Sequence, residues 1–315
     1  MQYRFEFRPY RRQFKRALQT SHGSWDVREG IIIRLTDKTR TSWGEIAPIH
    51  WFGSETLEQA LNFCSQLPDE ITQQTIFSIP AHLPACQFGF ESASVALGDG
   101  NHPISNTLSY SGLLPTGEAV LDQWQTLWEQ GYHTLKWKIG VAAIQDELKI
   151  FHKLIQALPT TAQLRLDANG GLTKQEANEW LRVCDRYGIE FLEQPLPVTH
   201  FDAMLELSDR YSTALALDES VATLDQLQDN YQQGWRGIFV IKAAIAGSPS
   251  RLRQFCHQHE IDAVFSSVFE TIIGRQAALK LAVELSCRNR AVGFGINHWF
   301  DDDEATWLEH LWNNL

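Results

Sequence analysis

The chain has 315 residues, 43% of them hydrophobic, so it can bury a large core in one or two domains. Its 27 basic and 38 acidic residues give a formal net charge of −11, which argues against binding to nucleic acids or to anionic membrane surfaces. The charged N-terminus, the lack of a long apolar run and five scattered cysteines without a CxxC pair predict a cytoplasmic protein with reduced thiols, no leader and no membrane span.

The first hundred residues mix predicted strands with predicted helices. Alternating or β-branched apolar residues predict strands in "YRFEFR" (3–8), "GIIIRL" (30–35) and "SWGEIAPI" (42–49). Helices are predicted at 55–67 and 85–98. Strands followed by helices indicate a small α+β domain, which we assign to residues 1–104.

From residue 105 the chain alternates regularly between apolar strands and amphipathic segments such as "IQDELKIFHKLIQAL" (144–158). The predicted strands lie near 106–110, 133–139, 163–168, 190–193, 214–218, 237–242, 261–267 and 291–295. Eight βα units predict an α/β fold, a (β/α)8 or modified TIM barrel, over residues 105–297. A doubly wound sheet is the alternative, but the chain has no GxGxxG turn. Residues 298–315 are expected to pack back on the N-terminal domain.

Charged residues end five consecutive strands of this predicted barrel, where barrel enzymes carry their chemistry. They are Lys136, Lys138, Asp167, Glu193, Asp218 and Lys242. The steps from Lys138 to Lys242 are 29, 26, 25 and 24 residues, about one βα unit each, so the charges recur at equivalent heights. Taken singly, a strand-end acid is more often a helix cap and a lysine more often solvated. Five successive strands ending this way favour a functional site.

The chemistry of this set suits a hard cation. Carboxylates from three strands, Asp167, Glu193 and Asp218, can supply oxygen ligands to Mg²⁺, with Mn²⁺ as an alternative. A carboxylate substrate bound there would hold its α-carbon between Lys138 and Lys242. In "TLKWKIG" (134–140) the two lysines share one strand face, so Lys136 is the neighbouring cation that favours the neutral, basic form of Lys138.

This pattern resembles the enolase superfamily, in its muconate-lactonizing subgroup, over nearly the whole chain. Within the subgroup the chain is most similar to the o-succinylbenzoate synthases, on the strings "TSHGSWDVREGIIIRL", "RLDANGG" and "FSSVFETIIGR". The resemblance implies a capping domain with a mobile specificity loop and a Mg²⁺-dependent lyase of menaquinone or phylloquinone biosynthesis. Such an enzyme converts 2-succinyl-6-hydroxy-2,4-cyclohexadiene-1-carboxylate to o-succinylbenzoate by syn-dehydration through an enediolate.

The resemblance also implies roles for individual residues. Lys138 would take the α-proton and then assist departure of the hydroxide, while Lys242 would act as a cation. Candidate substrate contacts are Arg165, Asn169, Ser266, Ser267 and, in the capping loop, Arg28. A salt bridge inside the barrel is the alternative for Arg165, and a solvated loop position is the alternative for Arg28.

Two rival functions stay open. Racemisation of N-succinylamino acids, or epimerisation of dipeptides, would use the same two lysines as opposed bases. Dipeptide epimerases generally carry an acidic pair after the last strand, whereas here no acid occurs before Asp301. A non-catalytic barrel would be expected to have lost one of the charges, and none is lost. The expected partner is a small carboxylate molecule, and the sequence leaves monomer and homo-oligomer both open.

Overall fold

The computed structural model describes residues 1–20, 23–99, 108–286, 288–295, 299–300 and 303–313. Apolar alternation in the first part produces a four-stranded antiparallel sheet among these residues, in the order β3-β2-β1-β4. Its strands are β1 Gln2–Thr20, β2 Gly23–Thr36, β3 Thr41–Ile46 and β4 Glu70–Thr72. The long β1–β2 hairpin projects toward the second domain, and its register shifts between Gln13 and Leu18.

Three helices complete this capping domain: α1 Leu57–Gln66, α2 Gln73–Phe77 and α3 Pro84–Asp99. Helix α1 begins with a capping box between Thr56 and Gln59, which satisfies two backbone N–H groups at its start. Helix α3 packs directly on β3 because glycines meet there. A Cβ on Gly44 would lie 2.1 Å from the carbonyl oxygen of Gly89, so only glycine permits this approach. The pair β4 and α2 was not predicted from the sequence.

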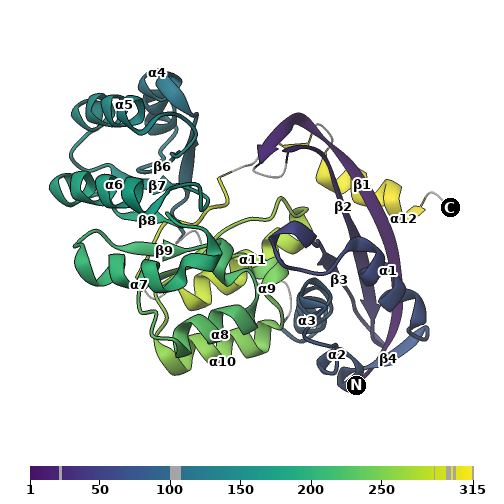
Figure 1. Cartoon of the computed structure of the whole chain (residues 1–315). Coiled ribbons are helices and arrows are strands. Elements are labelled where there is room, and N and C mark those ends of the chain that lie inside the picture. The colour runs from purple at the N-terminus through teal and green to yellow at the C-terminus, as the bar shows by residue number, and fades with distance from the viewer. Residues whose placement is uncertain (21–22, 100–107, 287, 296–298, 301–302, 314–315) are drawn as a thin grey trace.

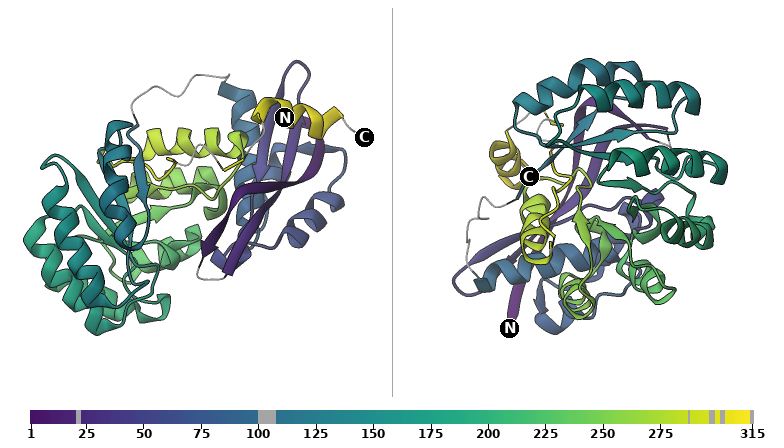
Figure 2. Two further views of the ribbon diagram at one scale, coloured as in Figure 1. Left: turned by 90° about the horizontal axis from the view of Figure 1, so that it is seen from above. Right: turned by 90° about the vertical axis from the view of Figure 1, so that its left-hand side faces the viewer.

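The second domain is a curled parallel sheet with helices on its outside (Figures 1 and 2). Within the described residues it has seven strands, β5 Ser111–Leu114, β6 Thr134–Lys138, β7 Gln163–Asp167, β8 Phe191–Glu193, β9 Leu215–Leu217, β10 Ile238–Ile241 and β11 Ala263–Phe265, hydrogen-bonded in sequence order. Its helices are α4 Val120–Glu129, α5 Ile144–Ala157, α6 Lys174–Tyr187, α7 Phe201–Arg210, α8 Leu224–Gln232, α9 Ala243–Ala246, α10 Pro249–His259 and α11 Ile272–Leu285. Short 3₁₀ helices cover His50–Phe52, Gly117–Ala119, Val198–His200 and Glu219–Val221. The predicted modified TIM barrel with a capping domain is confirmed.

Among the described residues the ring closes without a full eighth strand. Strands β5 and β11 are joined through isolated parallel bridges, Tyr110 with Val292 and Ser266 with Gly293. The prediction of a strand at 291–295 is therefore too long, since only two of these residues, Val292 and Gly293, form bridges. The first barrel strand was predicted at 106–110 but begins at Ser111, and residues 106–107 lie outside the described ranges.

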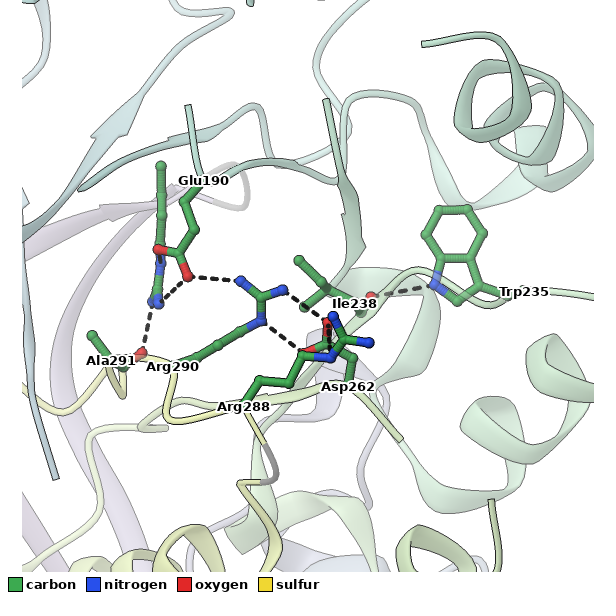
Figure 3. A network of polar contacts seen from close by, with 8 residues as sticks. Glu190, Trp235, Ile238, Asp262, Arg288, Arg290 and Ala291 are labelled. Atoms are coloured by element: carbon green, nitrogen blue, oxygen red, sulfur yellow. Dashed lines mark hydrogen bonds and ion pairs between the residues drawn. The ribbon is translucent and has the colours of Figure 1, made fainter. Parts of the chain in front are cut away.

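A network of ion pairs ties this weak seam to the rest of the barrel at the amino ends of the strands (Figure 3). Arg290 donates two hydrogen bonds to Asp262, at 2.7 and 2.8 Å, and one to Glu190 at 2.8 Å. Glu190 also accepts from Nε of Arg165 at 2.7 Å, and Arg165 Nη1 donates to the carbonyl oxygen of Ala291 at 2.7 Å. Arg165 is buried and the other three charges are partly exposed, and by neutralising one another they hold β7, β8 and β11 against the 291–293 segment.

Helix α12, Glu304–Asn313, leaves the barrel and lies against β1 and β3 of the cap (Figure 1). Trp307 packs edge-on against Tyr10 with ring centroids 5.4 Å apart, and Trp312 packs against Trp43 at 4.6 Å. The predicted domain boundaries, 104/105 and 297/298, and Asp301 all fall outside the described residues. Among the residues that are described, no helix combines the length and apolar character needed to cross a membrane.

Candidate active site

The carboxyl ends of strands β6 to β10 open into one pocket of about 690 Å³, at the end of the barrel that faces the cap. The polar side chains that line it include Lys136, Lys138, Arg165, Asp167, Asn169, Glu193, Asp218, Glu219, Lys242, Ser266 and Ser267, with Thr20, His50, Ser111 and Gln226 also in its lining. All six charges predicted at the strand ends therefore meet in a single cavity.

Parallel pairing delivers these groups to one height. Lys138 pairs with Asp167 across β6 and β7, and Asp167 pairs with Glu193 across β7 and β8. Alternation along β6 points Lys136 and Lys138 into the pocket and Trp137 outward. Trp137 is fully buried and packs edge-on against Trp180 of α6, with ring centroids 6.2 Å apart. The packing of Trp137 fixes the strand that presents both lysines.

Lys136 is held between two of the predicted metal ligands. Its Nζ lies 2.7 Å from Asp167 Oδ2 and 2.6 Å from Glu193 Oε1. Burial alone would lower the pKa of Lys136, but the carboxylates of Asp167, Glu193 and Asp218 outweigh it and raise that pKa above its usual value. The charge of Lys136 is thus largely compensated by these carboxylates.

The two lysines proposed to flank the substrate have different surroundings. Lys242 forms an ion pair with Asp218, and its Nζ lies 4.0 Å from the ring centroid of Phe52. Lys138, by contrast, makes no hydrogen bond or ion pair to any other described residue, and its side chain lines the pocket. Lys138 is therefore the lysine whose amine is available to a substrate.

The carboxylates are a chemically suitable set for a divalent cation. Burial raises the pKa of Glu193 to about 8, and the neighbouring carboxylate of Asp167 adds to this effect. Buried like charges of this kind need a cation, and carboxylate oxygens suit Mg²⁺. In the described part of the chain no three His, Cys, Asp or Glu side chains lie close enough together to hold a metal ion, and Lys136 and Lys242 are in contact with these carboxylates. The residues fit a metal that displaces those ammonium contacts.

A fourth carboxylate in the pocket, Glu219, was not predicted from the sequence. Its Oε1 accepts a hydrogen bond from Nδ2 of Asn169 at 3.1 Å, while its buried Oε2 has no partner among the described residues. Burial raises the pKa of Glu219 to about 7, with a further contribution from Asp218. The signal in the sequence was the Asp-Glu pair itself, at 218–219. An orphaned, buried acceptor beside the three carboxylates is consistent with a hydrated cation that donates to it.

The predicted substrate contacts fall into different environments. Asn169 lines the pocket with its backbone in the left-handed region, at φ 43°, and its N–H donates to Asp167. Ser266 and Ser267 line the opposite wall, although the Ser267 hydroxyl donates to Glu270. Arg165 reaches the pocket floor, but its guanidinium is engaged by the network at the amino ends of the strands. These contacts of Arg165 correspond to the alternative given above, a salt bridge inside the barrel.

Arg28 does not reach the pocket, and the expectation that it contacts the substrate requires correction. Its side chain is 1% exposed and donates to the carbonyl oxygens of Ala47 and Pro48. On β2, Arg28 pairs with Arg12 of β1, so the register of the hairpin turns it toward the segment that follows β3. Arg28 thereby anchors the residues before Ile49, which does line the pocket.

Aromatic side chains form the roof of the pocket, and sequence reasoning missed them. Trp25 lies at the centre, with ring centroids 5.0 Å from Trp51 and 5.5 Å from Phe269, and Phe269 lies 5.4 Å from Trp299. These rings come from the β1–β2 hairpin, the segment after β3, the segment after β11 and the residues before α12. An apolar roof excludes water from the charged floor and strengthens the electrostatic interactions there.

Comparison with known proteins agrees with this geometry. A family described as "Enolase C-terminal domain-like" matches residues 119–310, and one described as "MenC, N-terminal domain" matches residues 10–97. The o-succinylbenzoate synthase of Thermosynechococcus vestitus is 39% identical over 99% of both chains. A crystal structure of o-succinylbenzoate synthase from Thermosynechococcus elongatus, complexed with Mg in the active site, superposes with a TM-score of 0.92 and 39% identity over 99% of this chain and 100% of that one. The L-Ala-D/L-Glu epimerase of Bacillus subtilis, at 21% identity and a TM-score of 0.78 over 95% and 91% of the two chains, shares the fold.

Proposed function

We propose, from the premise that this chain belongs to the o-succinylbenzoate synthase family of the enolase superfamily, that its pocket dehydrates 2-succinyl-6-hydroxy-2,4-cyclohexadiene-1-carboxylate to o-succinylbenzoate. The observation that carries the proposal is the meeting of Lys138, three strand-end carboxylates and Lys242 in one pocket. The chain is accordingly a lyase that breaks a carbon–oxygen bond, in the biosynthesis of menaquinone or phylloquinone.

Lys138 is the proposed base. Its unpaired amine takes the proton from the carbon next to the substrate carboxylate, and the resulting ammonium then gives a proton to the departing hydroxide. One C–H and one C–O bond break, and the product leaves with one molecule of water. Lys242 contributes positive charge on the other face, and the aromatic roof keeps bulk water away from the reacting carbon.

Mg²⁺ is the proposed cofactor, held by Asp167, Glu193 and Asp218. When bound, it supplies Lewis acidity toward the substrate carboxylate as negative charge develops there. The donor chemistry of three buried carboxylates and the orphaned oxygen of Glu219 support this assignment. Lys136, which lies beside Asp167 and Glu193, adds positive charge that offsets part of the negative charge of these carboxylates. Asn169 and Ser266 are the proposed polar contacts to the substrate.

Purified protein with Mg²⁺ should convert the cyclohexadiene carboxylate to o-succinylbenzoate, followed by the change in ultraviolet absorbance as the ring becomes aromatic. The same preparation should be tested for exchange of solvent deuterium into N-succinylamino acids. Absence of dehydration together with rapid exchange would replace the proposal by racemisation.

Racemisation has one observation in its favour, because lysines lie on both sides of the carboxylates. The similarity over the whole chain argues against it. The chain is 39% identical to an o-succinylbenzoate synthase over 99% of its length, whereas the L-Ala-D/L-Glu epimerase is 21% identical.

We also propose the domain boundaries and the cellular location of the protein. The chain divides into a capping domain (1–104) that carries the specificity loop, a catalytic barrel (105–297) and a C-terminal segment (298–315). The site of action is the cytoplasm, a proposal that the buried cysteines support, since those described form no disulfide.

A further inference from the structure

The amino end of helix α11 is held by carboxylates that come from outside the barrel. The N–H of Ile272 donates to Glu304 Oε2 of α12 at 3.0 Å, and the N–H of Gly274 donates to Glu45 Oε2 of the cap strand β3 at 2.9 Å. The first N–H groups of a helix lack partners within the helix, and negative charge is favourable beside them. Helix α11 is therefore fixed by the cap and by the C-terminal helix.

Glu45 is the centre of this junction. It is fully buried, and Oε1 accepts from the Tyr10 hydroxyl at 2.6 Å and from the Thr271 N–H at 2.9 Å. Its other oxygen accepts from the Thr271 hydroxyl and from Gly274. A Cβ at position 274 would lie 2.8 Å from Glu45 Oε2, so glycine there makes the contact possible. Four donors, one from the cap and three from the barrel, thus converge on one carboxylate.

The pocket wall directly precedes this helix. Residues 266–269 line the pocket, and Glu270 holds them in place by accepting from the Val268 N–H at 2.6 Å. Phe269 has its backbone in the left-handed region, at φ 62°, and its ring packs against Trp25 of the cap hairpin. A segment this constrained transmits a displacement of the amino end of α11 to the pocket.

We propose that Glu45 is a positioning residue, which couples the placement of the cap to that of the wall 266–269 and so sets how tightly the remote part of the substrate binds. This inference rests on the proposed function, because it takes the carboxylate substrate to bind in this pocket. The proposed metal ligands lie on β7, on β8 and just after β9, whereas the described hydrogen bonds of Glu45 go to Tyr10, Thr271 and Gly274. Loss of its contacts should therefore act on substrate binding rather than on Mg²⁺.

The test is Glu45→Gln. The amide keeps the shape of the side chain but turns a donor toward the N–H groups of α11, where an acceptor is needed. We expect KM to rise about tenfold and kcat to change less than about threefold, since displacement of a substrate-positioning wall lowers affinity first. Mg²⁺ affinity, titrated by tryptophan fluorescence, should stay unchanged. Amide hydrogen exchange over residues 266–274 should accelerate.

Tyr10→Phe removes one hydrogen bond to Glu45 and leaves the contacts between Glu45 and α11 intact. It should give a smaller rise in KM, and it tests the same proposal if Glu45→Gln does not fold.

Asp185→Asn is the matched control, because Asp185 also accepts from two backbone N–H groups, those of Ser212 and Thr213, but lies away from the pocket. It should lower stability without changing KM. An unchanged KM in Glu45→Gln, or a fall in Mg²⁺ affinity, would overturn the positioning role. If the unaltered protein does not dehydrate the substrate, the proposed function fails, and hydrogen exchange over 266–274 still decides whether Glu45 couples cap and wall.

Discussion

Lys138 and Lys242 enter the pocket from β6 and from the end of β10, and their different contacts assign them different tasks. Because the Lys138 amine lines the pocket and contacts no other described residue, Lys138→Ala should lower kcat by about 10²- to 10⁴-fold, the usual contribution of a positioned base. Substrate binding should change little, since the proposed ligands of the carboxylate are untouched. Steady-state kinetics of the dehydration measures both effects. Near-normal turnover in Lys138→Ala, in protein with an unchanged circular dichroism spectrum, would show that Lys138 is not the base.

The raised pKa of Glu193, about 8, leads to a prediction on metal binding. Mg²⁺ requires the ionised carboxylate, so below pH 8 binding must displace a proton, and apparent affinity should rise between pH 6 and pH 8. The increase approaches about tenfold per pH unit if one proton is released per ion. Isothermal titration in buffers of different ionisation enthalpy counts that proton. An affinity that is flat over this range would mean that Glu193 is already ionised before the metal binds.

At the scale of elements, the ion-pair network at the amino ends of the strands helps to close the barrel at the seam, where the described residues form two isolated bridges and no full eighth strand. Arg290→Met removes the partner that Asp262 and Glu190 share, while Glu190 keeps Arg165 and Asp262 keeps Arg288. Losing hydrogen bonds between charged, partly buried groups costs about 2 kcal/mol. We expect that loss in the free energy of unfolding measured with urea. The exposed pair Arg253 with Glu284 is the control, and Glu284→Gln should cost at most about 1 kcal/mol. Equal losses of stability in the two variants would show that the network does not help to close the barrel.

The elements also explain what the sequence could and could not predict. Asp167 and Glu193 were found because each ends an apolar run, and that position is a local property of the chain. Arg28 was misplaced because its direction depends on the register of a hairpin whose pairing shifts along its length. Glu219 was missed because strand alternation would turn it away from Asp218. The chain leaves β9 at Leu217 and enters a 3₁₀ turn, where that alternation no longer holds.

For the whole molecule, the cap and the barrel make one site, since the charged floor belongs to the barrel and most of the aromatic roof to segments outside its strands. Tertiary contacts of this kind join Trp25 to Phe269 across about 240 residues of chain, and no local pattern in the sequence announces them. The charges of the floor are, however, balanced within the barrel itself. Asp167 and Glu193 share Lys136, and Asp218 is paired with Lys242.

That internal balance predicts how the protein responds to removal of metal. Chelation with EDTA should abolish dehydration, because no Lewis acid then opposes the charge that develops on the substrate. It should not unfold the protein, since the lysines compensate the carboxylates as they do in this structure and the hydrophobic core does not include them. Mg²⁺ at 100 times its Kd should add only about 2.7 kcal/mol of stability, seen as a modest rise in Tm. Activity should return on adding Mg²⁺ or Mn²⁺. Turnover tests the loss of activity, and circular dichroism measured in parallel tests whether the fold is retained. Unfolding on chelation would show that the lysines do not suffice to hold the carboxylate cluster together.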